Sequence, residues 1–364
     1  MRKTLLILLM LCSVCVCRAQ FWDVHSIKPP VPLRNAPDTV TLYVIGDVMM
    51  HSRQLEYDHH SFLSRISHKL GKADFAIANM EFPLGGKPYT GYPLFSTPDW
   101  YPEYVSDECG VDVFLLANNH VLDKGHAGLE RTMGIYGRMR DEGRIAYTGA
   151  AVDEADSKAV NPLILKRKGI SIALINFTYG TNIGPSGEWP RVSRMKREEV
   201  AEAIRSARAQ GAHFIIALPH WGTEYELRHN STQQEWAEWL VSKGVDAIVG
   251  SHPHVVQDTT HIKGVPVIYS VGNAVSNMSA TNTRLELGVK LSFTNDPAGR
   301  MKVMLEPELD FMWCTLPGTL TDSYSTIYVK EWASRRGDWL NPSDFDNMTG
   351  TLERVMDATG IGRE

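Results

Sequence analysis

Short apolar runs alternate with polar turns and helical patterns along most of this chain, and this alternation sets the class of fold. The runs are nearly continuous in apolar character, which is typical of strands that are covered on both faces. They lie at 41–45, 74–78, 111–116, 171–175, 213–218, 247–249 and 265–269. Helical patterns lie at 55–70, 199–210 and 231–242. Strands that alternate with helices in this way predict an α/β layered domain.

The pattern changes after about residue 285, and this change sets the expected domain limits. Residues 287–293 and 301–305 resemble the two strands of a hairpin around the turn at 295–299. The residues beyond are more polar. We therefore predict one domain over 39–310, with its core motifs within 41–290, and a helical extension over 311–364.

The N-terminal residues 1–19 have the parts of a secretory signal peptide: a basic start, an apolar stretch at 5–11 and a small-residue end at Ala19. A retained anchor helix is the alternative. Lipid attachment is a further one, because Cys12, Cys15 and Cys17 crowd this region. Residues 20–38 are rich in proline and predict an extended leader. We expect an exported protein, periplasmic or associated with the cell envelope.

Charge and cysteine content limit which partners the protein can have and how many disulfides it can form. The net charge is −5 and no basic stripe is present, which argues against nucleic acid as a partner. Cleavage after Ala19 would leave only Cys109 and Cys314, so the mature chain can form at most one disulfide.

Polar side chains follow six of the predicted strands, at the points where the strands end. Loops converge at the carboxyl ends of strands in such sheets, so these side chains are expected to meet. Carboxylates and imidazoles crowded together are costly to desolvate unless a cation lies between them. The residues are Asp47, Asn79 and Glu81, Asn119 and His120, His220 and Glu224, His252 and His254, and Asn273.

The stretch GSHPHVVQ at 250–257 gives the clearest metal signal. Its His-x-His pair would place two imidazole nitrogens near one centre, and His220 would complete the nitrogen set. Asp47 and Glu81 would supply negative charge. Mixed nitrogen and oxygen ligands suit manganese, iron or zinc better than calcium, and the absence of cysteine argues against structural zinc. We expect one or two divalent transition-metal ions.

The polar strand ends belong to six short motifs that follow one another along the chain. They are Gly46-Asp47, Ala78-Asn-Met-Glu81, Leu116-Ala-Asn-Asn-His120 with Asp123-Lys-Gly125, His220-Trp-Gly-Thr-Glu-Tyr225, Gly250-Ser-His-Pro-His254 and Tyr269-Ser-Val-Gly-Asn273. Their order resembles the CapA family of bacterial capsule and poly-γ-glutamate synthesis proteins. That family is similar in turn to the calcineurin-like metallophosphatases, which implies a four-layer αββα sandwich of the α/β class.

The resemblance also implies roles for individual residues. It implies His120 as general acid and Glu81 as a carboxylate that bridges two ions. The other implied ligands are Asp47, Asn119, His220, His252 and His254.

The chain departs from the metallophosphatase motifs at three places. Met49 stands where the first motif has its histidine, with His51 two residues further on. The second motif has become Ala-Asn-Met-Glu, and Val121 replaces an acidic residue in the third. These departures leave two questions open. The centre could bind one ion or two, and the protein could be catalytic or have lost its catalytic activity.

The predicted substrate contacts are Asn79, Trp221, Glu224 and Asn273. For Trp221 the alternative is a packing role, and for Asn273 it is the capping of a turn. A basic cluster at Arg191, Arg194, Lys196 and Arg197 would attract an anionic polymer or simply form the solvated start of a helix. The glycine-rich segment 180–190 would cover the cleft or only connect two elements.

Two functions from different classes fit these observations. The first is an exported metal-dependent hydrolase of phosphoesterase type, acting on a phosphoester or an amide-linked polymer during capsule, poly-γ-glutamate or related envelope-polymer biosynthesis. The second is a non-catalytic polymer-binding or assembly subunit of an envelope-associated synthesis or export complex. The Met49 departure favours the second, whereas the intact histidines favour the first.

Overall fold

The computed structural model describes residues 38–296, 299 and 301–362. The predicted signal peptide and nearly all of the predicted leader lie outside these residues. Within the described part of the chain, no helix is long and apolar enough to cross a membrane.

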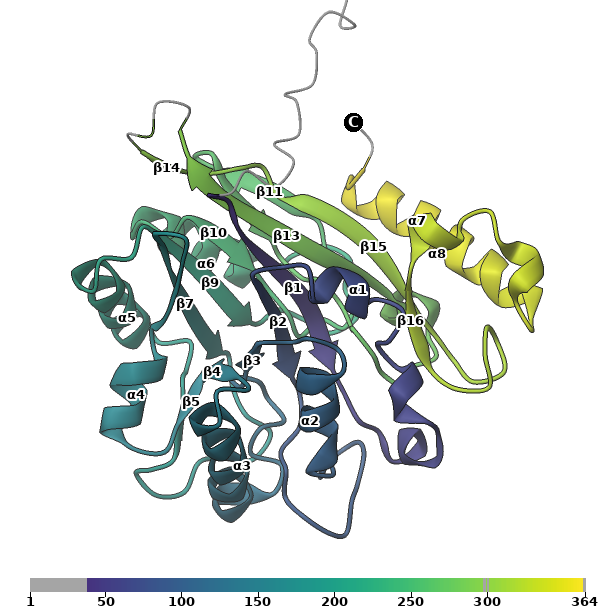
Figure 1. Cartoon of the computed structure of the whole chain (residues 1–364), viewed down its shortest axis with the longest axis horizontal. Coiled ribbons are helices and arrows are strands. Elements are labelled where there is room, and N and C mark those ends of the chain that lie inside the picture. Colours follow the sequence, from purple (N-terminus) through teal and green to yellow (C-terminus); the bar gives the residue numbers. More distant parts are fainter. Residues whose placement is uncertain (1–37, 297–298, 300, 363–364) are drawn as a thin grey trace, which may run out of the picture. The chain divides into compact units, whose positions relative to one another are not determined.

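The first sheet has eight strands and combines parallel and antiparallel pairing. Its order is β16-β15-β13-β1-β2-β3-β4, with β14 paired to β13 (Figure 1). The strands β1 to β4 run parallel, whereas β13, β15 and β16 pair antiparallel. The bounds are β1 Val40–Val48, β2 Phe75–Met80, β3 Val113–Leu115, β4 Ala146–Thr148, β13 Leu285–Asn295, β14 Lys302–Met304, β15 Glu308–Thr315 and β16 Ser325–Tyr328.

The second sheet has six strands in the order β11-β12-β10-β9-β7-β6. Its four central strands are parallel, and an antiparallel strand closes each edge. The bounds are β6 Leu163–Arg167, β7 Ile170–Thr178, β9 Phe214–His220, β10 Ala247–Val249, β11 Thr259–Ile262 and β12 Val265–Ile268. The short strands β5 (Ala150–Ala151) and β8 (Arg191–Val192) pair separately.

Side-chain alternation along the strands builds the layers. Leu42 and Val44 of β1 lie in a core that also contains Leu174 and Ile216 of the second sheet, so the two sheets pack face to face. Tyr43, on the opposite face of β1, belongs to a different core. This follows from the period of two in a strand.

Helices cover the outer face of each sheet. The first sheet packs against α2 (Trp100–Asp107) and α3 (Gly125–Asp141), and the second against α5 (Arg197–Ala209) and α6 (Ser231–Ser242). The short helix α4 (Glu154–Val160) lies between β5 and β6 in the chain. The predicted α/β four-layer αββα sandwich is thus confirmed.

The predicted helix over 55–70 is wrong. The structure has the 3-10 turns Ser52–Glu56 and His59–Ser61, and only α1 (Ser67–Leu70) is α-helical. The hydroxyls of Ser61, Ser64 and Ser67 donate to carbonyl oxygens three residues back. Such local bonds give the backbone an alternative to a continuous helix.

The segment 311–364 is helical only in part. The boundary at residue 310 falls inside β15, and β16 adds a further strand to the first sheet. The helical elements are α7 (Val329–Trp332), the 3-10 turn Arg336–Asp338 and α8 (Pro342–Thr359). Asn341 caps α8, and Gly360 ends it at a φ of 80°. Met348 and Val355 of α8 join the core of the two sheets, so this segment is part of the domain.

Cys109 and Cys314 are both free and buried. The one disulfide that the mature chain allows therefore does not form.

Candidate metal centre

The carboxyl ends of strands from both sheets converge on one buried group of side chains. Asp47 lies near the end of β1, and Glu81 directly follows β2. His220 is the last residue of β9, and the pair His252 and His254 follows β10. The arrowheads of β1, β2, β7 and β9 point to the same end of the molecule (Figure 1). The predicted meeting of the strand ends is what the structure shows.

Close backbone approach brings these elements together. The amide of Asp47 donates to the carbonyl of Gly272 at 3.0 Å. A Cβ on Gly46 would lie 1.9 Å from that same carbonyl oxygen, so any side chain there would force the strands apart. The Gly46-Asp47 motif is thus explained by packing as well as by chemistry.

Glu81 is the most unusual residue of the group. It is fully buried, yet neither carboxylate oxygen has a hydrogen-bond partner among the described residues. Its Oε1 lies 3.5 Å from Nε2 of His220 and 4.0 Å from Nε2 of His254. Burial raises the pKa of Glu81 well above its ordinary value, and the nearby Asp47 raises it further.

Asp47 is held by its neighbours in a fixed orientation. Its Oδ1 accepts a hydrogen bond of 2.7 Å from Nδ2 of Asn79. Its Oδ2 lies 3.4 Å from Nδ1 of His254 and 3.4 Å from the backbone nitrogen of His252. The side chain of Asn79 is buried and engaged with Asp47, and its contact with substrate stays a prediction. Asn79 is a positioning residue.

His220 lies between two polar partners. Its Nδ1 is 3.0 Å from the hydroxyl of Ser251, and its Nε2 is 2.8 Å from Oδ1 of Asn119. Neighbouring ligands of one ion lie roughly 3 Å apart when metal–ligand bonds are about 2.1 Å. The Nε2 atom and the Asn119 oxygen therefore have a spacing that suits two ligands of the same ion. Burial lowers the pKa of His220 well below its ordinary value, so the imidazole is neutral.

The His-x-His pair has a strained backbone. His252 and His254 have φ values of 101° and 58°, which are uncommon for residues with a Cβ. Nonglycine residues in such conformations concentrate at functional sites. Burial, with a smaller effect from His254, lowers the pKa of His252 to about 3, and its Nδ1 has no hydrogen-bond partner among the described residues. A neutral imidazole with an unpartnered nitrogen is ready to accept a cation.

His254 has the opposite electrostatic balance. Burial alone would lower the pKa of His254, but the hydrogen bond to Asp47, the charge of Asp47 and the bond to Asn273 together raise it. Asn273 is fully buried, with Oδ1 2.8 Å from Nδ1 of His254 and Nδ2 donating to the carbonyl of Thr283. The side chain of Asn273 therefore positions His254, and its contact with substrate stays a prediction.

The ligand atoms form overlapping sets. Glu81, His220 and His252 offer atoms that all lie within 4.8 Å of one another, and so do Asp47, Glu81 and His254. Glu81 belongs to both sets. This is the arrangement expected of a carboxylate shared between two adjacent cation sites. The ligand roles of these residues, including Asn119, stay predictions.

His120 pairs with an acid three residues further on. Its Nδ1 lies 2.6 Å from Oδ2 of Asp123, and both residues are buried. The amide Nδ2 of Asn182 donates to Oδ1 of Asp123 at 3.2 Å, and the ring of Phe95 packs edge-on against the imidazole. A proton on Nδ1 that is donated to Asp123 leaves Nε2 as the nitrogen that exchanges a proton with a substrate.

The two remaining substrate-contact predictions have different outcomes. Trp221 is fully buried in the core between the second sheet and α6, and its Nε1 donates to the carbonyl of Tyr269 at 2.9 Å. This position favours the packing role, and the contact of Trp221 with substrate stays a prediction. Glu224 is exposed and lies beside the centre, with a ligand atom within 4.8 Å of those of His252 and His254. That position fits a metal ligand as well as the predicted substrate contact.

The departures from the metallophosphatase motifs have visible consequences. Met49 is buried in the apolar core of the first sheet and its helices, so it offers nothing to the centre. His51 packs edge-on against Phe95, and its Nε2 is buried without a partner among the described residues. Burial, with smaller effects from His254 and His120, lowers the pKa of His51 to about 4.

Sequence reasoning missed Tyr179, Asn182 and Ser251. The ring of Tyr179 lies 4.6 Å from that of His252. Tyr179 and Asn182 follow β7, the one central strand whose end contributes no residue to the predicted site. The same rule about strand ends would have found them.

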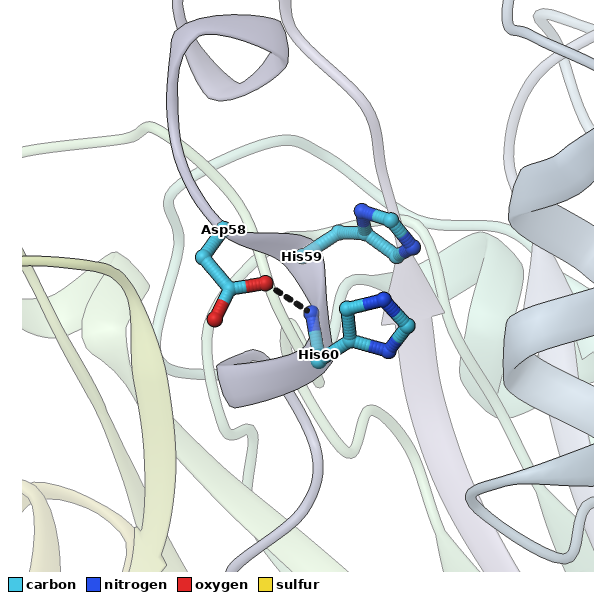
Figure 2. A group of neighbouring side chains, drawn as sticks. All are labelled: Asp58, His59 and His60. Carbon is cyan, nitrogen blue, oxygen red and sulfur yellow. Dashed lines mark hydrogen bonds between the residues drawn. The ribbon is translucent and has the colours of Figure 1, made fainter.

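A second group, made of Asp58, His59 and His60, also brings possible ligand atoms within 4.8 Å. Figure 2 shows that the carboxylate of Asp58 accepts from the backbone nitrogen of His60, at 3.1 Å, while the two rings lie to the other side. His60 also pairs with Glu108 at 2.7 Å. Asp58, His60 and Glu108 are exposed, and His59 is half-buried. The group is already internally paired, so the buried centre is the stronger candidate.

Comparison with known proteins identifies the family of this chain. The model of a family described as bacterial capsule synthesis protein PGA_cap matches residues 41–278, well over half of the chain. The chain belongs to the PGA_cap family. The resemblance to CapA proteins, first noted from the motifs, is confirmed.

Relatives of this PGA_cap protein include two named CapA. The capsule biosynthesis protein CapA of Bacillus anthracis is 28% identical over 68% of this chain and 62% of its own length. The PGA biosynthesis protein CapA of Bacillus subtilis is 30% identical over 51% of this chain and 48% of its own length. The chain thus spans about half to three-fifths of these relatives.

Solved structures with a similar arrangement include the calcineurin-like phosphoesterase YfkN from Bacillus subtilis. It is 14% identical, with a TM-score of 0.46, and the match covers 88% of this chain and 99% of the YfkN chain. A 5'-nucleotidase precursor from Thermus thermophilus is 15% identical, with a TM-score of 0.45, over 88% of this chain and 58% of that one.

Proposed function

We propose that this PGA_cap protein is an exported, metal-dependent hydrolase of phosphoesterase type that acts in the synthesis of a capsule, poly-γ-glutamate or a related envelope polymer. One observation carries the proposal. The carboxylate of Glu81 is buried with both oxygens unpartnered among the described residues, between Asp47 and the three histidines of the centre.

The donor set fits a divalent transition metal. A buried, unpaired carboxylate costs several kcal/mol unless it is neutralised or binds a cation. Neutral imidazoles at His220 and His252 add nitrogen donors, and Asp47 adds a second carboxylate. Such mixed sites suit manganese, iron or zinc. Asp47, Glu81, Asn119, His220, His252 and His254 would hold one or two ions.

A divalent cation bound there would supply Lewis-acid chemistry, polarising a substrate oxygen and lowering the pKa of a water molecule. The chain's own residues do the rest. His120, oriented by Asp123 through Nδ1, would deliver a proton from Nε2 to the leaving group. Asn182 and Phe95 keep that imidazole in place. The expected substrate is a phosphoester or an anionic, amide-linked polymer.

One observation favours a second function. Met49 occupies the place of a catalytic-motif histidine and is buried in the core, so the centre has one donor fewer than the metallophosphatase pattern. A centre of this kind would serve a non-catalytic subunit that binds an anionic polymer within an envelope-associated synthesis complex. Two Mycobacterium tuberculosis relatives, 22% identical, carry the name probable polyglutamine synthesis accessory protein.

A hydrolysis assay separates the two functions. Purified protein loaded with manganese, iron or zinc is tested on a phosphomonoester, a phosphodiester and a γ-linked glutamate polymer. The hydrolase proposal expects turnover of at least one of them, and loss of that turnover in His120→Ala with the metal retained. Inactivity on all substrates, together with tight binding of the polymer, would instead support the binding subunit.

A further inference from the structure

A cavity of about 1060 Å³ lies beside the candidate metal centre. Tyr179 belongs to both places, because it lines the cavity and its ring lies 4.6 Å from that of His252. The other walls come from α4, α5, the short strands β5 and β8, and the segment 185–196. Trp189 and Pro190 are among the apolar residues of the lining, and its charged residues include Glu198 and Glu202 as well as cationic side chains.

Four cationic side chains line this cavity, and three of them are paired with carboxylates. Lys158 pairs with Glu154, Arg191 with Glu188 and Lys196 with Glu199. Arg194 differs from the other three. Among the described residues, no carboxylate lies within 4.0 Å of its guanidinium, whose hydrogen bond goes to the hydroxyl of Thr181 at 2.9 Å.

The environment makes this unpaired charge costly. Arg194 is only partly exposed, and burial lowers the pKa of Arg194 below its ordinary value although the charge of Glu199 opposes part of this shift. A guanidinium is a planar donor that binds two oxygens of a carboxylate or phosphate at once. An unpaired and partly desolvated guanidinium on a cavity wall is therefore suited to an oxyanion from outside the chain.

Strand register fixes how far Arg194 lies from the metal centre. Arg194 forms a parallel bridge with Thr178 of β7, and Thr178 is paired with His220 of β9. His220 in turn bridges to Ser251. Arg194 is therefore two strand spacings from His220, which is about 10 Å between backbones.

From these contacts we infer that Arg194 and the cavity around it form an anion subsite, which binds a charged group of a polyanionic chain while another part of that chain reaches the metal centre. The inference deepens the proposed function. Its claim that another part of the chain reaches the metal centre rests on that function. Its ligand is a delocalised oxyanion that repeats along a polymer, either a carboxylate or a phosphate. Tyr179 lies on the path between the two places.

The test is isothermal titration calorimetry on the full chain with two probes of equal charge. One is a γ-linked oligoglutamate, which carries carboxylates, and the other is an oligomer of glycerol phosphate, which carries phosphates. The probe that binds more tightly identifies the oxyanion that the subsite prefers. Arg194→Gln is expected to weaken binding of the preferred probe by roughly tenfold to a hundredfold. Arg194→Lys keeps the positive charge but lacks the planar guanidinium that binds two oxygens at once. The affinity of this variant should therefore lie between those of the wild type and Arg194→Gln.

Arg336→Gln is the control, because Arg336 is an exposed arginine that is paired with Asp346 and lies outside the lining of the cavity. Its affinity should remain within about threefold of the wild type, as expected for an exposed ion pair. Equal affinity of Arg194→Gln and the wild type, or no binding of either probe by the wild type, would overturn the inference. Metal content is measured on each variant, because weaker binding of the probe at unchanged metal content reports on the subsite and not on the metal centre of the proposed function.

Discussion

Asn273 and His254 are joined by a hydrogen bond of 2.8 Å between Oδ1 of the amide and Nδ1 of the imidazole. The bond places the ring proton on Nδ1 and leaves Nε2 on the side of Glu81, 4.0 Å from its Oε1. Outer partners of this kind orient metal-binding histidines and tune their basicity. The centre is therefore built from a ring of ligand candidates and a second ring of amides and hydroxyls behind it.

Removing this amide should weaken metal binding. We expect Asn273→Ala to lower the affinity for manganese or zinc by about tenfold to a hundredfold, because the His254 ring loses its fixed orientation. Competition with a chromophoric chelator measures the change. Asn277→Ala is the control, since the side-chain oxygen of Asn277 accepts a hydrogen bond from the hydroxyl of Tyr324, which is not a residue of the centre. Unchanged affinity in Asn273→Ala would contradict the assigned role.

The acid behind His120 should matter for turnover and not for metal. Asp123→Asn exchanges the acceptor at 2.6 Å from Nδ1 for an amide and disturbs the tautomer of the ring. Because general acid catalysis contributes about 10² to 10⁴ in rate, kcat should fall by about a hundredfold or more while metal content stays constant. Asp99→Asn, in an exposed pair with Arg131, is the control. A loss of activity that follows a loss of metal would refute this division of roles.

A buried ion pair ties the C-terminal helix to the 3-10 turn Thr281–Arg284, which directly precedes β13. Arg284 and Asp344 form two parallel hydrogen bonds of 2.6 Å, and both side chains are nearly inaccessible. Asp344→Ala leaves the guanidinium buried and unpaired, which should lower the free energy of unfolding by about 3 to 5 kcal/mol. Urea denaturation measures it. Asp346→Ala, which removes an exposed pair with Arg336, should change stability little. Equal effects of the two variants would show that α8 is not an integral part of the domain.

Stability should depend on pH through Glu286. Burial raises the pKa of Glu286 well above its ordinary value, with one oxygen accepting from the amide of Gly46 at 2.6 Å. The folded chain therefore holds a proton that the unfolded chain releases above about pH 4.3, so this residue lowers stability as the pH rises through that range.

Glu286→Gln cannot ionise and removes this dependence. The free energy of unfolding of the variant, minus that of the wild type, should increase between about pH 4.5 and pH 8. Urea denaturation at several pH values measures the difference. Glu308→Gln, on the exposed side of the pair with Lys290, provides the comparison. A difference that is constant with pH for Glu286→Gln would show that Glu286 is ionised in the folded protein.

Much of the fold and the inner ring of the centre could be predicted from the sequence, because both depend on local patterns. Buried parallel strands appear as short apolar runs, and the residue that follows each run lies at the same edge of the layered domain. Asp47, Glu81, His220, His252 and His254 were found in that way. The structure brings these five together.

The outer ring could not be predicted, because its roles depend on contacts between distant segments. Asn273 follows a strand just as a ligand would, and only the position of His254 makes it a supporting residue. Trp221 directly follows His220, but the carbonyl of Tyr269 and the packing against α6 hold it in the core.

The two strands within 308–328 were missed for a similar reason. β15 is only partly buried along its first half, so its apolar pattern is weak, and its pairing partner β13 supplies the stabilisation. The 3-10 turns in 52–61 likewise reflect serine hydroxyls that compete for the backbone.

The most direct test of the metal centre is elemental analysis of the purified protein by inductively coupled plasma mass spectrometry, beside a variant with His252→Ala and His254→Ala. We predict one or two equivalents of manganese, iron or zinc in the wild-type chain and almost none in the double variant. A wild-type chain that takes up none of these metals, or a double variant that keeps its full complement, would contradict the account.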